Sequence, residues 1–167
     1  MSVILLSEEK LKNESVIQEN VDPKIIKPVL KEVQSYYIIP ILGSELYNDI
    51  QSKFGNWSAD YIDLIENYIQ PVMIQYALFE LPWAMNYKYF NKSVGTQDAE
   101  NMEPADLEEL TRITNNRKNK AEYFSERLTR FLIANPTKFP LYLSSTNIKT
   151  DTVFAQRNNY TSGMNLD

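Results

Sequence analysis

Residues 36–47 read YYIIPILGSELY, and this stretch contains the signals for two helices joined by a very short corner. The apolar run reaches Pro40, which lacks a backbone N–H and therefore disturbs a helix. Gly43 follows, and glycine tolerates the positive φ that a tight reversal needs. Ser44 is suited to cap a second helix over residues 45–54. The pattern predicts a helix–corner–helix unit with Gly43 at positive φ.

A second informative stretch covers residues 68–94 and reads YIQPVMIQYALFELPWAMNYKYFNKSV. Its first part continues a helix that Ser58 caps and that runs to about residue 85. This helix is apolar on nearly all sides, so it should be buried on most of them. Residues 87–94 alternate as a strand does. We expect one short strand there, paired either with residues 152–156 or with another subunit, because a lone strand leaves its backbone groups unpaired.

The remaining segments also indicate helices. Ser7 caps a short helix over residues 8–14, and Asp22 with Pro23 starts another, whose regular part could begin only at Lys27 because Pro28 interrupts it. The last helix is predicted over residues 104–134. The fold class is therefore an all-α bundle of four to five helices with one short strand or hairpin. We divide the chain into a helical domain, residues 1–139, and an extended carboxyl-terminal arm, residues 140–167, which should become ordered only against a partner.

Composition restricts the possible functions. The 167 residues include no cysteine and no histidine, which removes the thiolate and imidazole ligands of most metal sites and the commonest general base. No apolar run approaches the ~20 residues that cross a bilayer, and no signal peptide is expected. The four glycines are scattered, so no phosphate-binding loop is present. We expect no cofactor, no metal and no membrane contact.

Charged residues offer little for catalysis. The nearest acid pairs, Asp60 with Asp63 and Glu108 with Glu109, fall in the first turns of predicted helices, where the helix dipole favours acids. The last helix carries several basic residues, but Glu122 and Glu126 lie among them, so ion pairs along the helix are expected. The net charge of −5 does not favour nucleic-acid binding. We expect no catalytic residues and no sequence-specific binding of DNA.

An ordered set of short motifs resembles the small head-tail connector proteins of tailed bacteriophages, the ring-forming adaptors of the phage neck. The nearest likeness is to those of phages of Bacteroides-type hosts (crAss-like phages), and it covers roughly residues 5–132. The motifs are Ile38-x-Pro40-x-Leu42-Gly43-x-x-Leu46-Tyr47, Tyr68-Ile69-x-Pro71, Leu81-Pro82 and Asn91-Lys92-x-Val94.

The resemblance implies a structural virion protein of the neck, made in the cytoplasm of the bacterial host. It would form a homo-oligomeric ring, typically twelvefold, between the portal protein and the other neck and tail proteins. DNA would pass through the lumen of the ring, and the protein would carry out no catalysis. We expect the contacts with neighbouring subunits or portal to include Tyr87, Tyr89, Phe90, Lys92, Tyr142, Phe154, Arg157 and Tyr160.

Two other classes stay open from the sequence. The main alternative is a cytoplasmic helical protein–protein interaction module, such as a regulator or an assembly chaperone. Its oligomeric state would distinguish it, because a stable monomer or dimer without a portal partner does not fit a connector. The third class is an enzyme, which a convergent acidic pocket in the fold would support.

Overall fold

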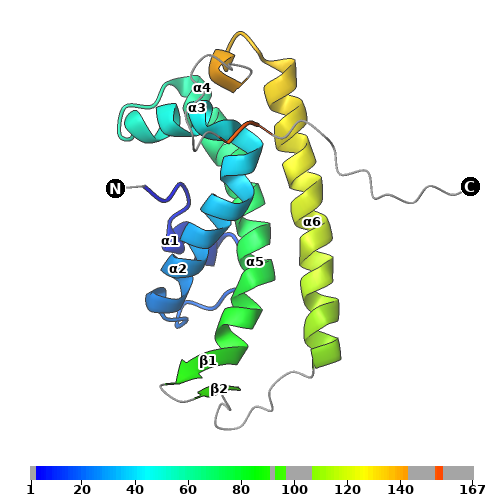
Figure 1. Cartoon of the computed structure of the whole chain (residues 1–167). Coiled ribbons are helices and arrows are strands. Elements are labelled where there is room, and N and C mark those ends of the chain that lie inside the picture. The colour runs from blue at the N-terminus through cyan, green and yellow to red at the C-terminus, as the bar shows by residue number, and fades with distance from the viewer. Residues whose placement is uncertain (1–2, 91–92, 97–106, 143–152, 156–167) are drawn as a thin grey trace, which may run out of the picture.

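Helix α5, Gln70–Asn86, runs through the middle of the molecule, with α1 and α2 on one side of it and α6 on the other (Figure 1). The computed structural model describes residues 3–90, 93–96, 107–142 and 153–155. Helix α1 spans Glu8–Asn13, α2 spans Pro23–Val33 and α6 spans Leu107–Ala134. Both α2 and α6 pack on α5. The expected all-α bundle with a short hairpin is confirmed.

The burial of α5 follows from its composition. Apolar side chains surround the helix, so it needs cover on every side. The layers formed by α2 and α6 supply that cover, and the expectation of a buried central helix is confirmed. Its buried apolar side chains are Val72, Met73, Ile74, Tyr76, Ala77, Leu78 and Leu81.

The helix starts follow the capping signals. The Ser7 hydroxyl accepts a hydrogen bond from the N–H of Lys10 at 3.1 Å, and the Asp22 carboxylate accepts one from the N–H of Lys24 at 2.9 Å. Helix α2 begins at Pro23 rather than at Lys27, which corrects the later start considered from the sequence. Pro28 lies within the helix on its exposed side, where water can hydrate the carbonyl group that lacks a helical partner.

Two π-helical turns precede two prolines with the same spacing. The turn η1, Gln34–Ile38, ends two residues before Pro40, and η2, Ile65–Ile69, ends two residues before Pro71. In both places the sequence reads Tyr-Ile-x-Pro. Proline has no N–H for the bond to the carbonyl four residues back, so the wider turn accommodates it. At the second turn the Arg127 guanidinium donates to the freed carbonyl of Asn67 at 3.4 Å.

The predicted corner lies within α3, Ile39–Ser52. Gly43 has φ 74° and ψ 158°, a combination that essentially only glycine adopts, and the helix bends there. Positive φ at Gly43 is therefore confirmed. Helix α4, Ala59–Leu64, follows with Ser58 as its cap and continues through η2 into α5. The long helix predicted for residues 58–85 is thus confirmed as a helical run with one π-turn inside it.

The segment after α5 forms a hairpin by itself. Strand β1, Tyr87–Phe90, pairs antiparallel with β2, Ser93–Thr96, in a register that places Phe90 opposite Ser93. The expectation that residues 87–94 form one strand paired with residues 152–156 or with another subunit is wrong. The chain reverses after Phe90, and local pairing satisfies the strand without the cost of closing a long loop.

The chain beyond α6 packs in the core as far as residue 142, which is further than the sequence indicated. Phe139 is fully buried and packs near Tyr61 and Phe131, and the 3-10 turn η3, Pro140–Tyr142, buries Tyr142 as well. Residues 140–142 therefore belong with the helical bundle, although the arm was expected to begin at residue 140. Phe139 contacts rings of α4 and α6, and η3 packs against α3.

Candidate functional site

Three glutamine side chains hold the amino-terminal segment by its backbone. The Gln51 amide accepts from the N–H of Val3 at 2.7 Å and donates to the Val3 carbonyl at 2.8 Å. The Gln34 amide accepts from the N–H of Leu5 at 2.8 Å and donates to the Val3 carbonyl at 2.9 Å. Gln70 donates to the Leu5 carbonyl at 2.8 Å. We call Gln34, Gln51 and Gln70 the glutamine clamp.

The two π-turns position two members of the clamp. Gln34 is the first residue of η1, and Gln70 directly follows η2. Both side chains are buried, and Gln34 also donates to the hydroxyl of Tyr47 at 2.8 Å. Sequence reasoning missed this clamp. The sequence signal for the clamp was a glutamine on an apolar helix face. Gln34 lies four residues after Leu30, and Gln70 lies at the start of the apolar run of α5.

A second backbone contact joins the Gly43 corner to the carboxyl-terminal segment. The N–H of Ser44 donates to the Val153 carbonyl at 2.8 Å, and the N–H of Val153 donates to the Ser44 hydroxyl at 2.9 Å. A Cβ atom at Gly43 would lie 3.0 Å from the backbone nitrogen of Ala155. Glycine is therefore required here both for its φ and for the close approach of another backbone.

Gln51 and Ser44 both lie in α3, so this helix contacts segments near both ends of the chain (Figure 1). In each case the recognised groups are mainly backbone N–H and C=O groups, which every residue except proline presents. This arrangement anchors chain segments. It presents no nucleophile or paired acid and base to a substrate.

The carboxylate of Asp49, a residue of α3, is stabilised in its charged form. Lys53 donates to the Asp49 carboxylate at 2.7 Å, and the Tyr61 hydroxyl donates to the same oxygen. Burial raises the pKa of Asp49, but the hydrogen bonds from Lys53 and Tyr61 outweigh it, so the pKa lies below its usual value. Burial and the neighbouring carboxylate raise the pKa of Tyr61. These contacts link α3 to α4.

Asp49→Asn is expected to reduce the acid sensitivity of the fold. Because folding lowers the pKa of Asp49, its contribution is present above the unfolded pKa of about 3.9 and is lost as the pH falls through the folded pKa. At pH 7 the variant should lose roughly 1–2 kcal/mol from its weakened hydrogen bonds. Urea unfolding at pH 7, 5 and 3 measures this, and an equal loss of stability in both proteins on acidification would contradict it.

The expected interface residues do not form one cluster. Tyr87, Tyr89 and Phe90 form β1, and only the backbone of that strand is described. Tyr142 lies in the core of its own chain, which differs from the expectation of an anchor on a partner. Phe154 is exposed beside the Gly43 corner, between two residues that contact α3. The others lie outside the described residues, namely Lys92, Arg157 and Tyr160.

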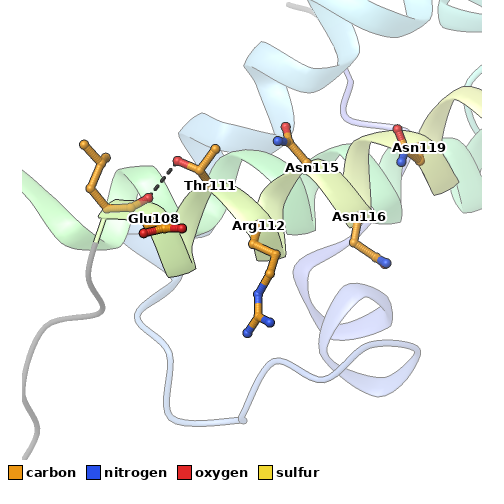
Figure 2. Close-up of a pocket in the computed structure, with 7 residues that line it drawn as sticks. Glu108, Thr111, Arg112, Asn115, Asn116 and Asn119 are labelled. Atoms are coloured by element: carbon orange, nitrogen blue, oxygen red, sulfur yellow. Dashed lines mark hydrogen bonds between the residues drawn. The ribbon is translucent and has the colours of Figure 1, made fainter.

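The first half of α6 has a shallow hollow along its outer side (Figure 2). The Thr111 hydroxyl donates a hydrogen bond to the Leu107 carbonyl, so this hydroxyl already has a partner within its own helix. The other polar side chains are three asparagine amides, the carboxylate of Glu108 and the guanidinium of Arg112, and all of them are exposed. An open polar surface of this kind fits a protein–protein contact better than a small-molecule site. The polar residues that line it are Glu108, Thr111, Arg112, Asn115, Asn116 and Asn119.

The acid pairs considered from the sequence have ordinary positions. Asp60 is exposed and pairs with Lys138 at 2.9 Å, and Glu108 and Glu109 are exposed in the first turn of α6. The ion pairs expected within the last helix are confirmed, with Glu122 bound to Lys118 and Glu126 bound to Arg130. Among the residues that the structure describes, no group of three or more acidic side chains could hold a metal ion. None of the described helices is long and apolar enough to cross a membrane.

Comparison with known proteins assigns a family without a known function. Residues 38–152 match the model of the DUF6712 family, described as a family of unknown function. This match covers more than half of the chain, so the protein belongs to the DUF6712 family. It includes the Gly43 corner, η2, the central helix and α6. No curated protein and no solved structure matches the chain.

Proposed function

We propose that this protein is a structural subunit of a tailed-phage neck, which assembles as a ring between the portal and the tail. The resemblance of its ordered motifs to head-tail connectors suggests the class of protein. The observation that carries the proposal is the first half of α6, which the described residues leave largely exposed. On this proposal the ring is typically twelvefold and its lumen continues the DNA channel.

Within the described part of the chain, the first half of α6 buries few of its side chains. Over residues 107–120 the buried side chains are Leu110 and Thr114, whereas Leu107 is 58% exposed and Ile113 is 46% exposed. A helical stretch of about this length is marginal in water without packing partners. Neighbouring copies in a ring would cover these turns and would explain why a long helix extends along the side of the bundle.

The two anchored segments also fit a structural role. The glutamine clamp and the Gly43 corner use side-chain amides and a glycine at positive φ to fix segments near the chain ends. Such features contribute to a defined shape, and they place no nucleophile and no paired acid and base around a shared substrate site. They support an assembly protein over an enzyme.

The oligomeric state, alone and with the portal, tests this proposal. The full chain is measured by native mass spectrometry and negative-stain electron microscopy, first by itself and then with the portal protein of the same phage. We expect a closed ring, or a ring that forms on the portal. A stable monomer or dimer that does not bind the portal would contradict the proposal and support a helical interaction module.

A further inference from the structure

We infer that the Gly43 corner, defined by Gly43 and Ser44, is a peptide-binding site that residues 153–155 of the same chain occupy as a replaceable ligand. The ligand is a short peptide segment with a free backbone N–H and C=O at its first residue and a small side chain at its third. A separate peptide with this pattern should therefore bind at the corner. This inference does not depend on the proposed ring.

The first residue of the segment is held by its backbone. The Val153 carbonyl accepts from the N–H of Ser44 at 2.8 Å, and the N–H of Val153 donates to the Ser44 hydroxyl at 2.9 Å. The side chains of Val153 and Phe154 are 38% and 54% exposed, so the first two positions select little by side chain. Such a pair of bonds suits any first residue except proline, which has no N–H to donate.

The third residue has to be small. A Cβ atom at Gly43 would lie 3.0 Å from the backbone nitrogen of Ala155 and 3.3 Å from its Cβ, so the missing side chain of Gly43 admits the segment. Ala155 is partly buried and packs against the hydrophobic core. Because protein interiors are closely packed, a longer side chain at residue 155 would collide with its surroundings. The corner therefore selects alanine or glycine at this position.

The segment can leave the corner without opening the core. At the amino-terminal end, the segment held by the glutamine clamp includes Leu5 and Leu6, which are 3% and 0% exposed and belong to the core. In contrast, none of residues 153–155 is fully buried. The contacts described for them at the corner are two hydrogen bonds and the packing of one alanine. A segment that buries so little apolar surface opens easily, and the corner is then free for another.

A labelled peptide tests this site on the full-length protein. Val153→Pro in the chain removes the N–H that donates to Ser44, which weakens the docking of the chain's own segment. A fluorescent peptide of residues 151–157, DTVFAQR, should then bind this variant. Its affinity should be about tenfold or more above that for the wild-type chain, whose own segment competes as a tethered ligand. Fluorescence anisotropy measures binding, and circular dichroism checks the fold.

Peptide variants distinguish recognition at the corner from general adhesion. Peptides with Ala155→Leu or Val153→Pro should bind about tenfold more weakly or worse, whereas Phe154→Ala should bind like the wild-type peptide. Ser44→Ala, added to the Val153→Pro chain, should lower the affinity for the wild-type peptide as well. No saturable binding to the folded Val153→Pro chain, or equal binding of the Ala155→Leu peptide, would overturn the site.

Hydrogen exchange on the wild-type chain gives a second test, which decides the question also where Val153→Pro alters the fold. A large molar excess of unlabelled peptide should displace residues 153–155. Their amides should therefore exchange faster as the peptide concentration rises. Exchange that stays unchanged at every peptide concentration would overturn the inference that this segment is replaceable.

Discussion

Val72→Asp is expected to abolish folding of the isolated chain. Val72 is fully buried in the first turn of α5, the helix on which α2 and α6 pack. A carboxylate there would be charged without a partner or would have to stay protonated, and either state costs several kcal/mol. Domains of this size are stable by about 5–15 kcal/mol, so the loss of stability is comparable with the total. Leu78→Asp, six residues further along the same helix, should behave in the same way.

The measurement compares circular dichroism and urea unfolding of Val72→Asp with those of Ile133→Asp. Ile133 lies on α6 and is 49% exposed, so the same type of change should alter stability by no more than about 0.5 kcal/mol. A Val72→Asp protein that stays folded with wild-type stability would show that α5 is not enclosed. Loss of folding in both variants would show instead that the chain tolerates no added acid.

Gly43→Val is expected to have the second-largest effect. A β-branched residue at φ 74° is strained by roughly 1–3 kcal/mol. Its Cβ would also meet the backbone nitrogen of Ala155 at 3.0 Å, so the carboxyl-terminal segment must move. The hydrogen bonds between Ser44 and Val153 would weaken as a result, which adds a further loss of roughly 1 kcal/mol.

Gly55→Val provides a matched control. Gly55 also has a positive φ, 84°, but no atom lies within 4 Å of a Cβ built there. The control therefore carries the backbone strain without the collision, and thermal unfolding should show a clearly smaller loss for Gly55→Val than for Gly43→Val. Protease digestion should in addition release the carboxyl-terminal segment faster in Gly43→Val alone. Equal losses and equal digestion would mean that the segment is not docked at the corner.

Local sequence signals were sufficient for most of the secondary structure. Caps such as Ser7, Asp22 and Ser58 act within one helical turn, and the conformational freedom of Gly43 is a property of the residue itself. The all-round apolar character of residues 72–81 required burial whatever the partners were. These features depend on neighbours in the chain or on composition, so they can be read without the fold.

The candidate site was not predictable in the same way. Gln34 and Gln70 resemble isolated polar residues on apolar helices, and only their approach to Val3 and Leu5 gives them partners. The π-turns that position them were also missed, because the sequence signal of proline indicates a kink and does not specify its form. The hairpin was expected only as an alternative to a single strand, because alternation reveals a strand but not what it pairs with.

The sequence by itself determined an all-α chain with a buried central helix, a glycine corner and no cysteine or histidine to bind a metal. These properties follow from residue type and short-range periodicity. Only the tertiary structure decided that Tyr142 packs in its own core, that residues 153–155 return to Ser44, and that the glutamine clamp meets the amino-terminal segment. Each of these joins residues far apart in the chain, and which contact forms depends on how the other elements have already filled the available space.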